Sequence, residues 1–312
     1  MKKNAAFHKK SEKRSGSELE GILTAHFGAT AEVENAAGET IRCHLRKNSE
    51  PVITGDRVWY TLEKEGTGIV IDHLPRTSLL ARPESKNKMK LVAANVDKML
   101  IVTAPPPILA EYLLDRYIIT AEHLNLEPII IFNKVDLLTD ETRPEVASRL
   151  RVYEKIGYRV IFSSVHTNQG LDELETCIKG STAVFVGPSG VGKSSLIASL
   201  IPTEVIRVGE TSLNGLGKHT TTMTRLYHLS QGGNLIDSPG VREFGLGQMA
   251  KEDILQGFAE FRPFLRGCKF RNCSHLSELD CAVQRALENG DISASRFESF
   301  KEMMTGEQFH RR

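Results

Sequence analysis

The sequence predicts a protein of three folded parts: an all-β barrel, an α/β domain built on a parallel sheet, and a small helical module that binds a metal. Short strands broken by glycines fill the chain to about residue 82, and apolar runs alternating with helical stretches begin near residue 95. Beyond about residue 246, helical spacing surrounds three of the five cysteines. A chain of 312 residues is long enough for this division. We expect an arm at 1–17, a barrel at 18–82, an α/β domain at 83–246 and the helical module at 247–312.

The composition is that of an ordinary globular protein. Hydrophobic residues make up 40%, charged residues 25%, and the net charge is +1. Any nucleic-acid surface must therefore come from local patches. No apolar run reaches about 18 residues, and the basic first fourteen residues lack the apolar segment of a secretory signal. We expect a cytoplasmic protein with no membrane segment, whose basic arm is either a flexible terminus or an RNA contact.

The barrel is predicted from short strands at regular spacing. The expected strands are 20–25, 30–35, 40–45, 56–62 and 68–74. Such a series, with turn signals between its members, is typical of a small barrel or sandwich. A five-stranded OB-type barrel fits the length, but the pattern alone does not separate it from an SH3-like barrel.

The α/β domain is predicted from strands that are apolar on both faces. Apolar runs occur at 99–103, 128–132, 160–162, 183–186 and 234–236, and helical stretches at 109–124, 144–156 and 171–178. This alternation indicates a parallel sheet covered by helices on both sides. Ligands bind at the carboxyl ends of the strands in such a sheet.

A phosphate loop of the form G-x-x-x-x-G-K-S follows one of these strands. Its residues are Gly187, Pro188, Ser189, Gly190, Val191, Gly192, Lys193 and Ser194, with Ser195 next. Glycines let backbone N–H groups turn inward around phosphates, and the following helix adds partial positive charge. We expect Lys193 to reach the β- and γ-phosphates and Ser194 to bind Mg²⁺. Taken alone, this motif would also fit an ATPase or a kinase.

An N-K-x-D motif directs the prediction toward guanine. Asn133, Lys134 and Asp136 come directly after the strand at 128–132. A carboxylate at Asp136 would accept hydrogen bonds from the guanine N1–H and 2-amino group, a donor pair that adenine lacks. We expect Asn133 to tie the loops together and the stem of Lys134 to cover the base. A second loop, at Ser163 and Ser164, would offer backbone N–H groups to the guanine oxygen.

A D-S-P-G segment and a glycine-rich loop complete the predicted nucleotide site. Asp237 would hold Mg²⁺ through water, and the Gly240 N–H would contact the γ-phosphate. Residues 215–222 have the composition of a mobile switch loop, and one of its threonines should complete the Mg²⁺ shell. We favour Thr221 over Thr220.

The residue that orients the attacking water is not a glutamine. Ras-like enzymes carry that glutamine two places after the equivalent glycine, roughly where this chain has Arg242. His219 is a candidate, because an imidazole can orient or deprotonate water; the alternative is a solvated histidine with no such role. We expect slow intrinsic hydrolysis, on the order of 10⁻⁴ to 10⁻² s⁻¹.

The C-terminal cysteines have the spacing of a metal site. Cys268, Cys273, His275 and Cys281 supply three thiolates and one imidazole, which suits one closed, structural zinc ion per chain. Helices are expected at 254–265, 281–288 and 293–304. Four basic residues near the first ligands form either a phosphate-binding patch or a solvated face: Arg262, Arg266, Lys269 and Arg271.

The order of the motifs is inverted relative to Ras-like GTPases, because N-K-x-D precedes the phosphate loop. The chain thus looks like a circularly permuted GTPase. With G-K-H-T-T, D-S-P-G and C-x₄-C-x-H-x₅-C, it resembles the RsgA (YjeQ) family over nearly its whole length. The resemblance implies a monomeric GTPase that binds the small ribosomal subunit, hydrolyses GTP there and assists late maturation. It also implies rRNA contacts by the barrel and zinc module, and a catalytic role for His219.

Two other functions fit the same residues. One is a GTP-gated RNA-binding adaptor in which hydrolysis is incidental, and the other is a GTPase acting on tRNA or another RNA. The permutation suits the ribosomal role, because residues 241–253 lead from the D-S-P-G segment into the metal module. The state of the nucleotide is therefore expected to set the position of that module relative to the barrel.

Overall fold

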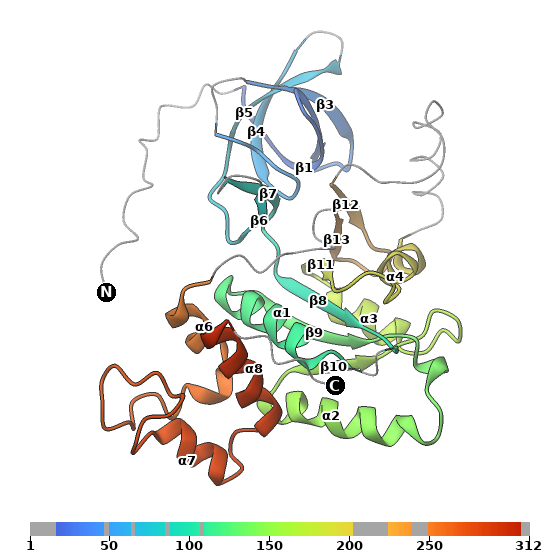
Figure 1. Ribbon diagram of the computed structural model, residues 1–312. Helices are drawn as coiled ribbons and strands as arrows, with labels where there is room; N and C mark the ends of the chain where they lie inside the picture. The colour runs from blue at the N-terminus through green and yellow to red at the C-terminus, as the bar shows by residue number, and fades with distance from the viewer. Residues whose placement is uncertain are drawn as a thin grey trace.

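The computed structural model describes residues 17–46, 50–63, 66–84, 88–106, 109–201, 224–238 and 249–306. Three parts follow one another in space (Figure 1). The barrel lies above the central sheet, and the C-terminal helices lie beside the sheet's helical layer. The predictions for residues 1–16 of the arm, His219, Thr220, Thr221, Gly240 and Arg242 lie outside the described residues.

The first part is a closed five-stranded barrel. Its strands are β1 (Leu19–Phe27), β2 (Thr30–Asn35), β3 (Thr40–Leu45), β4 (Arg57–Leu62) and β5 (Gly68–His73). They pair in the order β1-β2-β3-β5-β4, and β4 pairs back onto β1. All the pairings are antiparallel except β3 with β5. This order is that of an OB-type barrel, so the structure resolves the alternative that the strand pattern left open.

A two-stranded hairpin that was not predicted joins the barrel to the central sheet. It consists of β6 (Leu79–Glu84) and β7 (Lys88–Ala94), which pair only with each other. Pro83 lies within β6, and a proline inside a short run argues against a strand unless that strand is at an edge. Both strands are edges here, so the proline is tolerated.

The central sheet has six strands, five of them parallel. These are β8 (Lys98–Thr103), β9 (Glu127–Phe132), β10 (Arg159–Phe162), β11 (Thr182–Val186), β12 (Arg225–His228) and β13 (Asn234–Asp237). Their order is β10-β9-β8-β11-β13-β12, with β12 antiparallel to β13. The strand β12 was not predicted, because it is short and mostly polar. It also pairs with β1 through Ala25 and Arg225, so the barrel and the sheet are continuous.

Helices cover both faces of this sheet, as predicted (Figure 1). They are α1 (Glu111–His123), α2 (Thr142–Ile156), α3 (Leu171–Ile178) and α4 (Lys193–Leu200). Ile130 and Phe132 of β9 pack in a cluster with residues of α1 and α2. The alternating residues Ile129 and Ile131 pack in a second cluster with residues of α3 and α4. Burial on both faces is why β9 reads as a continuous apolar run.

The C-terminal part differs from the prediction in its first helix. A helix over 254–265 was expected, but α6 (Lys251–Gly257) ends early and only a 3-10 turn, η3 (Ala259–Phe261), follows. The helices α7 (Ala282–Glu288) and α8 (Ala294–Thr305) agree with expectation. Phe258 leaves the helical conformation, and its ring stacks on Phe261 at 4.9 Å. Packing of these two rings with Phe300 thus replaces the second half of the expected helix.

A buried ionic cluster fastens the C-terminal part to the α/β domain. Arg296 of α8 is 0% exposed, and its guanidinium donates to Asp115 of α1 at 2.7 Å and to Glu260 at 2.7 Å. The Tyr153 hydroxyl of α2 also donates to Asp115, at 2.8 Å. Burial raises the pKa of Asp115, and the neighbouring Arg296 opposes that shift. The metal module is therefore held on α1 and α2 by buried charge as well as by apolar packing.

Among the helices that the structure describes, none is long and apolar enough to cross a membrane.

Candidate functional site

Four loops meet at the carboxyl edge of the central sheet. Asn133 follows β9, Ser163 follows β10, Gly187 follows β11, and Asp237 ends β13. The strands β9 and β10 are neighbours, as are β11 and β13, and β8 lies between the two pairs. The motifs that the sequence separates by up to about a hundred residues are thus brought to one edge, where α/β sheets bind ligands.

The phosphate loop needs glycine at three positions for structural reasons. Gly187, Gly190 and Gly192 have φ angles of +136°, +86° and +95°. A Cβ at Gly187 would lie 2.2 Å from the Val102 carbonyl oxygen, and one at Gly192 would lie 2.4 Å from Asn133 Nδ2. These glycines provide both the turn and the close approach of β8 and the N-K-x-D loop.

Lys193 lies inside the loop. Its side chain is buried, and its Nζ donates to the carbonyl oxygens of Gly187 at 2.7 Å and Pro188 at 2.5 Å. Lys193 also begins α4, and Ser194 and Ser195 are exposed in the first turn of that helix. An ammonium group and a helix N-terminus at one point form a site for an anion such as phosphate.

Asn133 joins the base-reading loop to the phosphate loop. Its side chain is 2% exposed, and Nδ2 donates to the Val191 carbonyl at 2.9 Å. Its Oδ1 accepts from the Ser163 hydroxyl at 3.1 Å. The side chain therefore bridges three loops, and its buried polar atoms are satisfied.

Lys134 and Asp136 lie on the exposed side of this bridge. Lys134 has a left-handed backbone with φ of 60°, and its Nζ donates to the Gly190 carbonyl at 2.6 Å. The Ser164 hydroxyl donates to Asp136 Oδ1 at 2.5 Å, and this bond lowers the pKa of Asp136. The carboxyl is therefore ionised at neutral pH and is an acceptor for paired N–H donors.

Backbone hydrogen bonds of Ser163 and Ser164 hold the second loop in place. The Ser163 N–H donates to the Phe132 carbonyl at 2.9 Å, and the Ser164 N–H donates to the Gln169 carbonyl at 3.0 Å. These N–H groups hold the loop to β9 and to its own turn. The expectation that this loop offers a backbone N–H to the guanine oxygen stays a prediction. What Ser163 and Ser164 contribute is their hydroxyl groups, which orient Asn133 and Asp136.

Oxygen donors suitable for Mg²⁺ lie on neighbouring elements. Asp237 is half-buried at the end of β13, and Ser194 is exposed at the start of α4. Val184 of β11 pairs in register with Ile236, which precedes Asp237. A hydroxyl and a carboxylate are oxygen ligands that suit this hard cation.

The four predicted metal ligands of the C-terminal part lie close together. The ligand atoms of Cys268, Cys273, His275 and Cys281 all lie within 4.8 Å of one another. His275 Nδ1 lies 3.4 Å from the sulfur of Cys268 and 3.4 Å from that of Cys281, and those two sulfurs lie 3.9 Å apart. A tetrahedral ion with metal–sulfur bonds of about 2.3 Å would place its thiolates about 3.8 Å apart. The four residues therefore fit a structural metal ion.

The surroundings of these ligands favour metal binding through their effect on the His275 pKa, a hydrogen bond to Cys268 and the fold of the ligand loop. Burial lowers the pKa of His275, which favours the neutral imidazole that a metal needs. The Ala282 N–H donates to the sulfur of Cys268 at 3.3 Å. Glu278 accepts the backbone N–H of Ser274 at 2.7 Å, and that bond lowers the pKa of Glu278 to about 2. Glu278 was not predicted from the sequence, because its role depends on the fold of the ligand loop.

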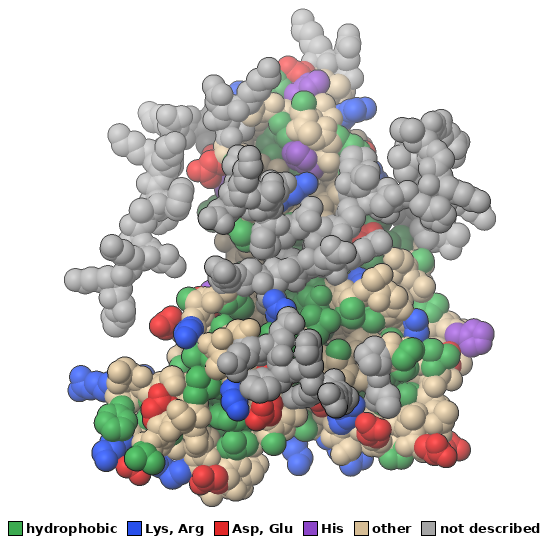
Figure 2. Space-filling view, in the orientation of Figure 1, with side chains coloured by type: hydrophobic (Ala, Val, Ile, Leu, Met, Phe, Trp, Pro, Cys, Tyr) green, Lys and Arg blue, Asp and Glu red, His purple; other side chains and the backbone are tan. Residues whose placement is uncertain are grey.

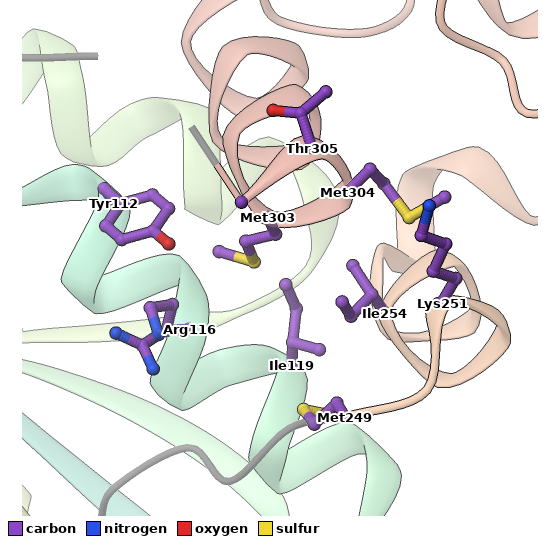
Figure 3. Close-up of a pocket in the computed structure, with 10 residues that line it drawn as sticks. Tyr112, Arg116, Ile119, Met249, Lys251, Ile254, Met303, Met304 and Thr305 are labelled. Atoms are coloured by element: carbon purple, nitrogen blue, oxygen red, sulfur yellow. The ribbon is translucent and has the colours of Figure 1, made fainter. Parts of the chain in front are cut away.

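A hollow of about 550 Å³ lies elsewhere, between α1, α6 and α8. Tyr112 and Arg116 of α1 face Met303 and Met304 of α8 across it (Figure 3). No residue of the phosphate loop or the N-K-x-D motif is among the residues that line it. The hollow belongs to the junction between the metal module and α1, and it is separate from the nucleotide site.

Comparison with known proteins agrees with this geometry. The family model of the RsgA GTPase matches residues 73–247. Proteins named small ribosomal subunit biogenesis GTPase RsgA are 45% identical in Pseudomonas putida and 47% identical in Chromohalobacter salexigens. The alignments cover 93% of this chain, with 86% of the first relative and 87% of the second.

Two solved structures are similar over 95% of this chain. YjeQ from Thermotoga maritima has a TM-score of 0.78, 31% identity and 100% coverage of its own chain. YloQ, described as a circularly permuted GTPase, has a TM-score of 0.75, 28% identity and 97% coverage. The fold, the motifs brought to one sheet edge and these matches agree: the chain belongs to the RsgA family of GTPases.

Proposed function

We propose that this GTPase binds the small ribosomal subunit, hydrolyses GTP while bound and assists late maturation of that subunit. The observation that carries the nucleotide part is the hydrogen bond from Asn133 to the Val191 carbonyl, which joins base reading to phosphate binding. The names of the relatives, small ribosomal subunit biogenesis GTPases at 45% and 47% identity, support the ribosomal part.

The residues of the site have separate roles in this proposal. The phosphate loop and Lys193 hold the phosphates, while Asp136 accepts from the guanine edge. Ser194 and Asp237 hold Mg²⁺, directly and through water. Lys193 donates to two loop carbonyls in this structure, and phosphate oxygens would replace them when GTP binds.

Several assignments fall on residues that the structure does not describe. His219 positions the attacking water, Thr221 completes the Mg²⁺ shell and the Gly240 N–H contacts the γ-phosphate. The support is their place in the sequence, between and after motifs whose strands and loops are described.

The metal is proposed to be one structural zinc ion per chain. Three thiolates and one imidazole form a closed set that leaves no position for a reactive water. The ion would hold together a loop that has little regular structure between η3 and α7. Its role is to fold the module, with no part in the hydrolysis step.

The zinc loop is proposed to contact RNA. Phe270 is 49% exposed between two of the ligands, and Lys269 lies 5.7 Å from the centre of its ring. Arg271 follows directly and Arg266 precedes the first ligand. Figure 2 shows basic, apolar and acidic side chains together at the lower left, over the C-terminal part. Cations attract phosphates and an exposed ring can stack on an unpaired base.

The domain boundaries are proposed from the change in sequence pattern along the chain. We propose a basic arm at 1–17, an RNA-binding barrel at 18–82, the permuted GTPase domain at 83–246 and the zinc module at 247–312. The protein is proposed to act as a cytoplasmic monomer, since its partner is a large assembly of that compartment.

One experiment tests the function directly. GTP turnover is measured alone, with purified small subunits, with large subunits and with tRNA. Stimulation by small subunits alone is expected. Binding without stimulation would favour a GTP-gated adaptor, and stimulation by tRNA would point to another RNA substrate. Co-sedimentation with a non-hydrolysable GTP analogue checks that binding requires the GTP state.

A further inference from the structure

A turn of the barrel packs against the end of the strand that carries Asp237. The turn spans residues 53–56, just before β4. Gly55 at its centre has φ of +92°, and a Cβ there would lie 2.2 Å from the Ala94 carbonyl oxygen and 3.0 Å from Ile236 Cδ1. Ile236 directly precedes Asp237 in β13. The barrel is thus in close contact with the segment proposed to hold Mg²⁺.

This turn is held in one conformation by buried charge. Asp56 is fully buried, and its carboxylate accepts the Ile53 N–H at 2.8 Å. The same carboxylate accepts two bonds from the Arg76 guanidinium, at 2.7 and 2.8 Å. Asn95 Nδ2 donates to the Gly55 carbonyl at 2.9 Å. Paired, charge-assisted bonds of this kind leave little freedom to the residue between them, Thr54.

Thr54 begins a chain of hydrogen bonds that leaves the barrel. Thr54 is 1% exposed, and its hydroxyl donates to the Thr224 carbonyl at 3.1 Å. The Thr224 hydroxyl donates to Ser238 Oγ at 2.8 Å. Thr224 comes two residues after the predicted switch loop 215–222, and Ser238 directly follows Asp237. Two bonds therefore connect the barrel, through Thr224, to the D-S-P-G segment that the sequence assigns to Mg²⁺ and γ-phosphate contact.

We propose that Thr54 is a positioning residue for GTP hydrolysis, acting through Thr224 on the segment that contains Asp237 and Ser238. A shift of the barrel would then move the Mg²⁺ ligands. Other contacts between β12 and the barrel are less directional: Arg225 pairs with Glu32 at 3.0 Å and His228 with Glu34 at 2.9 Å. These pairs are partly exposed, and such pairs contribute little.

This inference rests on the proposed function in one respect, since it explains how a partner bound to the barrel would alter turnover. It differs from the expectation that the metal module is the part connected to the switch. The metal module is fixed to α1 through Arg296 and Asp115, whereas the barrel contacts Thr224, which in turn donates to Ser238 of the D-S-P-G segment.

The test removes single hydroxyl groups without changing side-chain shape. Thr54→Val and Thr224→Val each break one bond of the chain, and Thr54→Ser keeps the hydroxyl. The matched control is Thr24→Val, because the buried Thr24 hydroxyl also donates to a backbone carbonyl, that of Glu32, but within the barrel. For each variant, kcat and KM for GTP are measured for the free protein and with small subunits present. The Mg²⁺ concentration for half-maximal turnover and the midpoint of thermal unfolding are measured as well.

The expected result is a loss of about 3- to 10-fold in kcat for both valine variants, with a higher Mg²⁺ requirement and nearly unchanged KM. The double variant should lose no more than either single variant, because the two bonds act in series. Thr54→Ser should restore turnover and Thr24→Val should leave it unchanged. If Thr54→Val lowers the midpoint of thermal unfolding, the kcat of Thr224→Val decides whether the hydrogen bonds matter for turnover. Thr224 is less buried, so its substitution should disturb the fold less.

Normal kcat and Mg²⁺ dependence in both valine variants would overturn the inference, as would additive losses or an equal loss in Thr24→Val. A wild-type protein that small subunits do not stimulate would contradict the proposed function instead. In that case the turnover of the free protein still decides on Thr54.

Discussion

The side chain of Asn133 donates a hydrogen bond of 2.9 Å to the backbone carbonyl of Val191. These residues are 58 positions apart and come from the base-reading loop and the phosphate loop. The bond joins the two loops, so we expect binding of the guanine base and binding of the phosphates to be coupled through this buried amide.

The first prediction concerns this amide. Asn133→Ala leaves the Val191 carbonyl and the Ser163 hydroxyl without their partner, which costs about 1–3 kcal/mol per buried group. We expect affinity for both GDP and GTP to fall at least about 10-fold. Titration with fluorescently labelled GDP measures the change. Asn35→Ala, at an exposed turn of the barrel, is the control, and an equal effect in both variants would contradict the bridge.

The second prediction concerns base selectivity. Asp136→Asn replaces an acceptor by an amide that can donate, so the paired N–H donors of guanine lose their partner. We expect GTP affinity to fall by at least about 10-fold, while a xanthine nucleotide, with a carbonyl in place of the 2-amino group, binds better than it does to the wild type. Competition between the two nucleotides measures this. Unchanged preference for guanine would remove Asp136 from base recognition.

The third prediction concerns the metal. Cys273→Ala should reduce bound zinc from one ion per chain to almost none and unfold the loop that carries the ligands. Metal content is measured by mass spectrometry together with GDP affinity, which should remain, because the nucleotide loops lie on other elements. Cys177→Ala removes a buried cysteine of α3 outside the cluster and should keep its zinc. Equal zinc in the two variants would disprove the ligand set.

The fourth prediction concerns the buried cluster between the metal module and α1. Arg296→Met leaves Asp115 and Glu260 as uncompensated buried acids, and we expect a loss of about 3–5 kcal/mol in the stability of the module. Adding Asp115→Asn should recover part of that loss. Arg262→Ala is the control, because its pair with Glu122 is partly exposed and is worth less than about 1 kcal/mol. Urea unfolding of the three variants compares them, and a small effect of Arg296→Met would be inconsistent with this role.

The fifth prediction concerns the exposed ring of the zinc loop. Phe270→Ala should weaken binding to small subunits by about 1–3 kcal/mol if a base stacks on it, while Phe270→Trp keeps the stacking surface. Leu279→Ala removes a more exposed apolar side chain of the same loop that offers no ring. Binding is measured at several salt concentrations, with intrinsic GTP turnover as the folding check. A loss shared by Leu279→Ala would indicate an apolar protein contact instead.

The predictions from sequence were best where periodicity and local chemistry agree. Ile129 to Phe132 are buried on alternate faces, and so their continuous apolar run predicted β9 correctly. The glycines of the phosphate loop were identified for the same kind of reason, since positive φ angles admit few other residues. Motif order and cysteine spacing were likewise readable without coordinates.

The predictions from sequence failed where the local structure depends on a residue far away in the chain. Residues 225–228 are short and polar, and they form β12 only because β13 and β1 lie on either side. Phe258 leaves the helical pattern because Phe261 and Phe300 provide a better environment for its ring.

By itself the sequence determined the chemical groups of this protein: the phosphate loop, the aspartate expected to read guanine, and three thiolates with one imidazole. Those depend on residue types at short spacing, where backbone geometry follows from local sequence. Only the tertiary structure decided which domains contact one another and through which residues. Asp115 meets Arg296 across 181 positions, and Thr54 meets Thr224 across 170. Contacts of that range are selected by the packing of whole layers, which no local pattern records.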